Sequence, residues 1–189
     1  MPRDPAKLFP HDYLMKPIVF FIPKFIRPNH VTVFRVLMTP LVLLFLYLEI
    51  YPIAVPLFFF VGMTDALDGS IARIRKQITA WGTFYDPVAD KIFIGSILLL
   101  VVIQHINPII AIALIFIELV IIVGGWFRRK KSSIAANNWG KAKMLLEGIG
   151  ILFLLISLWL GVDLFVDLST GTLALAIVFA IASLLTYSL

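Results

Sequence analysis

Four aspartates lie in the middle of a chain that is otherwise strongly apolar. They are Asp65, Asp68, Asp86 and Asp90, and hydrophobic residues make up 61% of the 189 residues. A carboxylate at the centre of a bilayer costs about 2.5 to 3.5 kcal/mol on insertion scales. Four unneutralised carboxylates would cost roughly 10 kcal/mol or more, so a ligand or partner side chains must neutralise them.

The spacing of these aspartates predicts that they converge on one site. Asp65 and Asp68 are three residues apart and Asp86 and Asp90 are four apart, so each pair shares one face of a helix. If the two helices form a hairpin, Asp65 lies level with Asp90, and Asp68 with Asp86. With Arg73 near the membrane surface, Asp65 lies about 12 Å deeper. The site is then within the membrane but reached from the cytoplasm.

Four carboxylates at one site suit two divalent cations. Carboxylate, water and phosphate oxygens are the ligands that Mg²⁺ and Mn²⁺ prefer, and two such ions about 4 Å apart can drive displacement at phosphorus. Two other interpretations remain open. The aspartates could form buried ion pairs with Arg73, Arg75 and Lys91, or they could line the pathway of a divalent-cation transporter.

Small residues beside the aspartates favour a bound ligand over a permeating ion. Gly69 follows Asp68, Ala72 lies one turn beyond Asp68, and Gly82 faces Arg73 across the predicted hairpin. The short side chains leave a slot between helices, which an ion pathway does not need. The guanidinium of Arg73 can bind a pyrophosphate at the mouth of this slot. Small residues also permit close helix packing, which needs no ligand.

This pattern resembles the complete signature of the CDP-alcohol phosphotransferase family. The residues that carry the resemblance are Asp65, Asp68, Gly69, Ala72, Arg73, Gly82, Asp86 and Asp90. The resemblance implies a six-helix membrane enzyme, usually a homodimer, that uses two Mg²⁺ or Mn²⁺ ions. Such an enzyme moves a phosphate-linked alcohol from a CDP donor to a hydroxyl group and releases CMP.

The resemblance also implies a role for each residue. Asp65, Asp68, Asp86 and Asp90 are expected to hold the metals, and Asp86 and Asp90 to take part in catalysis, with Asp90 as general base, ligand or both. The expected CDP-donor site comprises Asn29, Thr32, Gly69, Ala72, Arg73 and Gly82.

Three further motifs resemble the phosphatidylglycerophosphate synthase branch of that family. They are Pro28-Asn29 with Thr32 and Arg35, Asp86-Pro87-Val88-Ala89-Asp90-Lys91, and Gly140-Lys141-Ala142-Lys143. This branch transfers a phosphatidyl group from CDP-diacylglycerol to glycerol 3-phosphate and forms phosphatidylglycerol phosphate.

A phosphorylated acceptor calls for a basic pocket, and the sequence offers Arg128, Arg129, Lys141 and Lys143. The positive-inside rule explains the same cluster without a ligand. Ser70 stands where an aromatic residue is expected. The arginine that is associated with the start of the fourth span in this branch is missing near Glu118. Other acceptors therefore stay open, namely inositol phosphate, serine and phosphatidylglycerol, as does a CDP-linked ether lipid as donor.

The elements that must position these residues are membrane helices. The mean hydropathy of the chain is +1.01, and six apolar segments have about the 20 residues needed to cross the hydrocarbon. The segments lie at approximately 30–49, 52–75, 81–104, 107–128, 140–161 and 168–188. Short connections predict a single all-α domain over 1–189, with an interfacial segment at 1–27 and a six-helix bundle at 28–189. The sequence contains no cysteine, which excludes a thiolate nucleophile or a disulfide.

The basic residues predict the orientation. Lys and Arg gather before the first segment, after the second, and between the fourth and fifth, whereas the loops near Glu49, His105 and Asp163 hold none. By the positive-inside rule both termini and the aspartate site face the cytoplasm of a prokaryotic cell. The net charge of +5 thus reflects topology, and nucleic-acid binding is not expected.

The segment before the first span has an apolar periodicity of its own. Leu14, Ile18, Phe21 and Phe25 recur at near-helical spacing, which predicts an amphipathic helix in the membrane interface. No cleavage pattern for a signal peptide follows its apolar stretch, so insertion is expected to depend on the first span.

Overall fold

The computed structural model describes residues 10–23, 25–128 and 138–188, and its regular elements there are all helical. In chain order they are α1 (Pro10–Phe21), α2 (Pro28–Tyr47), α3 (Tyr51–Ile74), α4 (Ala80–Ile97), η1 (Leu98–Val102), α5 (Ile103–His105), α6 (Pro108–Arg128), α7 (Asn138–Leu160) and α8 (Leu164–Ser188). The prediction of an all-α chain is confirmed.

Four helices in the described part of the chain are long and apolar enough to cross a membrane. They are Pro28–Tyr47, Tyr51–Ile74, Trp139–Leu160 and Leu164–Thr186. These ranges agree to within a few residues with the spans predicted at 30–49, 52–75, 140–161 and 168–188. A further apolar stretch, Pro108–Ile121 in α6, is shorter. The chain is therefore an integral membrane protein.

The span predicted at 81–104 is a helical run whose hydrogen bonding changes partway. α4 continues directly into η1, which is π-helical, and then into α5. Single π-helical turns interrupt α-helices without breaking them. The sequence of η1, LLLVV, gives no signal for the change, because apolar residues of this kind suit both hydrogen-bonding patterns.

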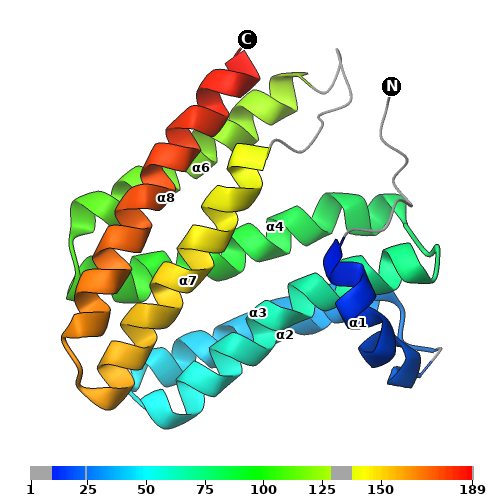
Figure 1. Cartoon of the computed structure of the whole chain (residues 1–189), viewed down its shortest axis with the longest axis horizontal. Coiled ribbons are helices and arrows are strands. Elements are labelled where there is room, and N and C mark those ends of the chain that lie inside the picture. The colour runs from blue at the N-terminus through cyan, green and yellow to red at the C-terminus, as the bar shows by residue number, and fades with distance from the viewer. Residues whose placement is uncertain (1–9, 24, 129–137, 189) are drawn as a thin grey trace.

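Short connections pair the helices along the chain. Residues 48–50 join α2 to α3, and residues 161–163 join α7 to α8, where Gly161 has a φ of +69° that glycine adopts without strain. Figure 1 shows α2 beside α3 and α7 beside α8, and α4 runs between the two pairs with contacts to both α2 and α7.

In place of the hairpin predicted for α3 and α4, these two helices make few direct contacts in the described structure. A Cβ on Gly62 would lie 4.0 Å from Phe93, and the rings of Phe58 and Phe93 stack with centroids 5.5 Å apart. Along the rest of their length α2 packs against both helices. The reason is chemical, because Arg35 and Thr32 of α2 reach acidic side chains on α3 and α4.

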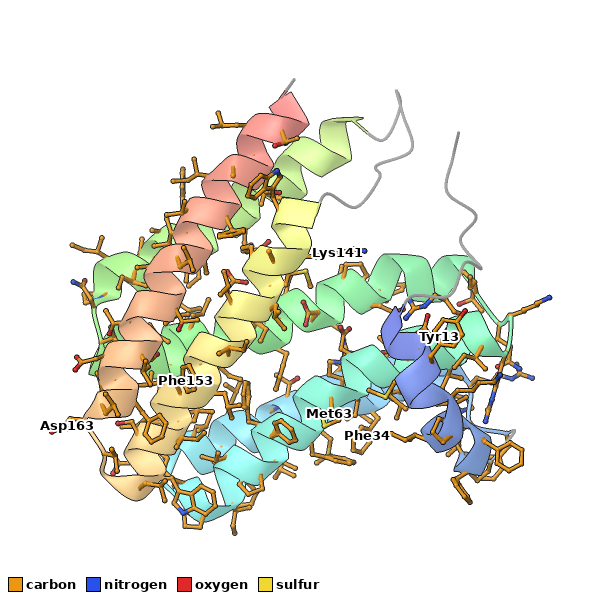
Figure 2. All side chains as sticks on the ribbon, in the orientation of Figure 1. Tyr13, Phe34, Met63, Lys141, Phe153 and Asp163 are labelled. Atoms are coloured by element: carbon orange, nitrogen blue, oxygen red, sulfur yellow. The ribbon has the colours of Figure 1, made fainter. Side chains whose placement is uncertain are left out.

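The apolar core joins the two helix pairs, while other apolar side chains point outward. Buried core residues include Val42, Phe58, Phe93, Leu114, Leu154 and Leu173. Phe34 and Met63 point away from the ribbon (Figure 2) and are among the exposed large apolar residues. Such an apolar exterior suits a hydrocarbon environment rather than water.

α1 packs against the end of α3. Val19 is buried in a small apolar cluster with residues of α2 and α3, whereas Ile18 and Phe21 are exposed. Of the other two residues in the predicted apolar face, Phe25 is also exposed, and the side chain of Leu14 lies outside the described residues. One face of α1 is thus attached to the protein.

Candidate active site

Arg35 of α2 lies between two of the four aspartates. Its Nη1 donates to Asp65 Oδ1 at 2.8 Å and its Nη2 donates to Asp68 Oδ2 at 2.6 Å. Arg35 is fully buried, Asp68 is nearly so, and the Asp65 side chain is 44% exposed. The ion pairs considered from the sequence therefore exist in part, but with Arg35 as the cation instead of Arg73, Arg75 or Lys91.

The second pair of aspartates faces the same region from α4. Thr32 Oγ1 donates to Asp86 Oδ1 at 2.5 Å. The charges of Asp65 and Arg35 act on Asp86 and also on Asp90, so all four carboxylates lie within electrostatic range of Arg35. The structure thus brings together the aspartates that the sequence placed at one site.

The donor chemistry of this cluster fits a hard divalent cation. Four carboxylates carry more negative charge than the single guanidinium of Arg35 balances, and Mg²⁺ and Mn²⁺ prefer oxygen ligands. In the part of the chain that the structure describes, no three acidic or histidine side chains lie close enough to hold one ion as they stand. Mg²⁺ is usually held by one or two carboxylates together with water and phosphate oxygens, and this aspartate cluster could supply such carboxylates.

A cavity of about 190 Å³ lies beside the aspartates, between α2, α3 and α4. Its lining includes five residues of the predicted donor site together with one aspartate, namely Asn29, Gly69, Ala72, Arg73, Gly82 and Asp86. Thr32, the sixth predicted donor residue, is not in the lining but bonds to Asp86. The structure therefore gathers the predicted donor residues around one space.

The glycine at position 82 allows polar side chains to approach the backbone in this cavity. A Cβ on Gly82 would lie 3.1 Å from Thr79 Oγ1, 3.2 Å from Asn29 Oδ1 and 3.3 Å from Asp86 Oδ2. Thr79 caps α4 by accepting from the Gly82 N–H at 3.0 Å, and it donates to Asn29 Oδ1 at 2.8 Å. Any larger residue at position 82 would displace these side chains.

Arg73 is held in the cavity by a residue that sequence reasoning missed. Its Nε donates to Asp12 Oδ2 at 2.8 Å and its Nη2 donates to Asp12 Oδ1 at 2.8 Å, while Ser70 Oγ donates to Asp12 Oδ1 at 2.7 Å. Asp12 belongs to α1 and is 1% exposed. Asp12 is the acidic residue in the first turn of α1, and nothing in the sequence pointed from it to Arg73.

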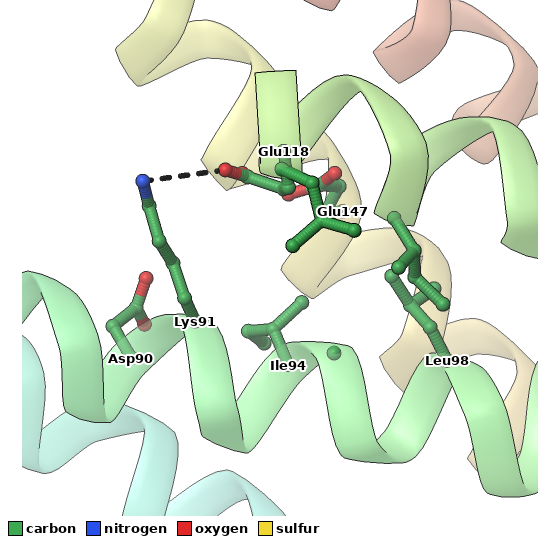
Figure 3. Close-up of a pocket in the computed structure, with 9 residues that line it drawn as sticks. Asp90, Lys91, Ile94, Leu98, Glu118 and Glu147 are labelled. Atoms are coloured by element: carbon green, nitrogen blue, oxygen red, sulfur yellow. Dashed lines mark ion pairs between the residues drawn. The ribbon is translucent and has the colours of Figure 1, made fainter. Parts of the chain in front are cut away.

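Asp90 lines a second cavity, of about 110 Å³ (Figure 3). Besides Asp90 it is lined by charged and apolar residues that include Lys91, Glu118, Glu147, Ile94 and Leu98. Lys91 Nζ lies 3.4 Å from Glu118 Oε2, the pair drawn with a dashed line in Figure 3. This cavity therefore combines charge with an apolar wall.

Of the four residues predicted to bind an acceptor phosphate, the structure describes the side chains of Lys141 and Lys143. Lys143 is buried and forms ion pairs with Glu118 and with Glu147, the latter at 3.2 Å. Lys141 is exposed. The Arg128 side chain and the whole of Arg129 lie outside the described residues. Lys143 is therefore paired with two carboxylates of the protein.

The chain is similar to known proteins over most of its length. The family model for CDP-alcohol phosphatidyltransferase matches residues 25–186. A Haemophilus influenzae protein named CDP-diacylglycerol–glycerol-3-phosphate 3-phosphatidyltransferase is 40% identical over 129 residues, which are 64% of this chain and 70% of that protein. Proteins of the same name from Sodalis glossinidius and Escherichia coli are 33% and 34% identical, and cover 85% and 68% of this chain and 91% and 75% of their own length. Since the family model spans most of the sequence, the chain belongs to the CDP-alcohol phosphatidyltransferase family and is a transferase.

Proposed function

We propose that this chain transfers a phosphatidyl group from CDP-diacylglycerol to the hydroxyl of glycerol 3-phosphate, forming phosphatidylglycerol phosphate and releasing CMP. The observation that carries the proposal is the cavity lined by Asn29, Gly69, Ala72, Arg73 and Gly82 together with Asp86. The names of the relatives support the choice of both substrates. Membership of a transferase family favours this reaction over cation transport.

The donor is proposed to bind with its diphosphate beside Arg73. The guanidinium offers several donors in a fixed fork, which matches phosphate oxygens. Gly69 and Gly82 let the donor approach the backbone of α3 and α4, as side chains already do at Gly82. Asp65, Asp68, Asp86 and Asp90 would hold two Mg²⁺ or Mn²⁺ ions, which when bound neutralise the diphosphate and the charge at the attacked phosphorus.

Asp90 is proposed to take the proton of the acceptor hydroxyl. Asp90 lines the second cavity, and the positive charges of Lys91 and Lys143 act on its carboxylate. As the acceptor oxygen forms a bond to phosphorus, the bond from phosphorus to the CMP oxygen breaks, and CMP leaves with the electron pair. Asp86, held by Thr32, is the second residue assigned to catalysis.

The acceptor phosphate is proposed to bind at the start of α7 near Lys141, with Arg128 and Arg129. Lys141 is exposed there, and its ammonium group can pair with a phosphate. Lys143 lies two residues further along α7, where it forms ion pairs with Glu118 and Glu147.

The proposal includes six membrane spans. Four are the long apolar helices, and α6 and the run from α4 through α5 supply the other two. The distribution of Lys and Arg supports cytoplasmic termini and a cytoplasmic site. α1 would lie in the interface with Ile18 and Phe21 toward lipid. A homodimer, which the resemblance implies, completes the proposed assembly.

The test is CMP release by the purified protein in detergent with CDP-diacylglycerol, Mg²⁺ and a panel of acceptors. Glycerol 3-phosphate is expected to support turnover, and inositol phosphate, serine and phosphatidylglycerol are expected not to. Turnover with one of the other acceptors would replace glycerol 3-phosphate in the proposal. If no acceptor yields CMP and the protein carries divalent cations into liposomes, the transfer reaction is wrong.

A further inference from the structure

α1 places a buried charge against the donor cavity although it lies outside the family match. The match begins at residue 25, whereas α1 comprises Pro10–Phe21. Asp12 of α1 is buried against α3 and bonds to Arg73 and Ser70. An element outside the shared domain therefore contacts a side chain of the shared site.

The docking of α1 on α3 is built from more than this ion pair. Arg75 donates to the carbonyl oxygens of Val19 at 2.9 Å, of Ile22 at 2.5 Å and of Ile26 at 3.0 Å. Val19 lies in the last turn of α1, where carbonyl groups lack helical partners, and Ile22 and Ile26 lie in the connection from α1 to α2. Val19 adds an apolar contact with Ile71. Asp12 is thus carried by an anchored helix.

The geometry of the pair fixes the direction of the guanidinium. Both oxygens of Asp12 engage one edge of Arg73, through Nε and Nη2 at 2.8 Å each. A Cβ on Gly69 would lie 3.1 Å from Nη1 and 3.3 Å from Nη2, so the guanidinium lies over Gly69, which lines the donor cavity. A two-point bond to a planar group leaves little rotational freedom, and an arginine held in place loses less entropy when it binds a ligand.

We propose that α1 positions Arg73 for the diphosphate of the CDP donor, and that Asp12 is the positioning residue. The inference rests on the proposed function, in which Arg73 contacts the donor phosphates. Asp12 does not touch the donor itself and acts through Arg73.

The first test is the steady-state kinetics of Asp12→Asn, which keeps the size of the side chain and removes its charge. We expect the KM for CDP-diacylglycerol to rise about tenfold, the loss of one well-placed charged hydrogen bond. The kcat and the KM for the acceptor should stay within about twofold, since a residue that only orders the donor site affects donor binding. Lys16→Gln, an exposed charge change on the same helix, is the matched control and should retain the wild-type KM.

The second test separates positioning from a merely structural role. Because Asp12 acts through Arg73, the double variant Asp12→Asn with Arg73→Gln should have the same donor KM as Arg73→Gln alone. The double variant removes both charges, so it leaves no buried unpaired ion and supplies the measurement even where Asp12→Asn is not recovered folded. Additive increases in donor KM would overturn the inference.

An unchanged donor KM in Asp12→Asn would also overturn the positioning role of Asp12. A lowered donor KM would overturn it as well, because it would show that Asp12 competes with the donor for Arg73. Either result leaves the proposed reaction intact, because wild-type turnover is measured in the same assay. If the wild type releases no CMP, the proposed function fails, and the affinity of each variant for CDP, measured by calorimetry with Mg²⁺, still decides the role of Asp12.

Discussion

Arg35 Nη2 lies 2.6 Å from Asp68 Oδ2, and both side chains are buried. A buried carboxylate without a cation is strongly unfavourable, so loss of Arg35 alone would leave Asp68 destabilised. The same guanidinium also bonds Asp65, and its charge reaches Asp86 and Asp90. Arg35 is thus a fixed positive charge within the site that is proposed to bind metal.

Replacement of Arg35 by Gln should make the stability of the protein depend on divalent cations. Without the guanidinium, Asp68 is buried with no cation, and the loss of one partner of a buried pair costs about 3 to 5 kcal/mol. We expect a lower Tm in EDTA and a larger gain of Tm on adding Mg²⁺ than in the wild type, measured by thermal unfolding in detergent. An equal loss of Tm with and without Mg²⁺ would contradict metal binding at these aspartates.

Asp65→Asn, Asp68→Asn and Asp86→Asn should each reduce CMP release about a thousandfold or more, because the several kcal/mol of charge stabilisation from a bound metal is lost. Asp163→Asn, an exposed aspartate in the loop before α8, is the matched control and should keep full activity. Gel filtration in detergent verifies that each variant is folded. Activity retained in all three variants would eliminate the metal-dependent mechanism.

Removal of divalent cations from the wild type should stop turnover reversibly. EDTA is expected to abolish CMP release, and an excess of Mg²⁺ or Mn²⁺ to restore it, because the carboxylate site needs a hard cation. Unchanged turnover after exhaustive chelation would show that Arg35 and Arg73 suffice to neutralise the donor.

The sequence predicted the helices and the helix faces that carry the aspartates, because both depend on local periodicity. Apolar length fixed the spans, and the three- and four-residue spacing fixed the faces of Asp65, Asp68, Asp86 and Asp90. The sequence did not predict that Arg35 bonds both Asp65 and Asp68, or that Arg73 bonds Asp12. These contacts join residues 30 to 61 positions apart, and only the packing of α1 and α2 on α3 brings them together.

Gly82→Ala should impair donor binding, because the new Cβ would lie within 3.3 Å of Thr79, Asn29 and Asp86. We expect the KM for CDP-diacylglycerol to rise about tenfold, as for a misplaced binding group. Gly148→Ala, on α7, meets nothing within 4 Å and should leave the KM unchanged. Equal kinetics for the two variants would show that the cavity between α2, α3 and α4 is not the donor site.

Lys143→Met should destabilise the protein, whereas Lys141→Met should not. Lys143 is buried between Glu118 and Glu147, so its loss leaves the buried carboxylate of Glu147 and the partly exposed carboxylate of Glu118 without this cation, and should lower the free energy of unfolding by about 3 kcal/mol. Adding Glu147→Gln removes one of those charges and should recover part of the loss. Lys141 is exposed, so Lys141→Met should keep its Tm and instead raise the KM for glycerol 3-phosphate. A Lys143 variant with wild-type Tm but a raised acceptor KM would show that Lys143 binds the acceptor and that its glutamate pairs are not structural.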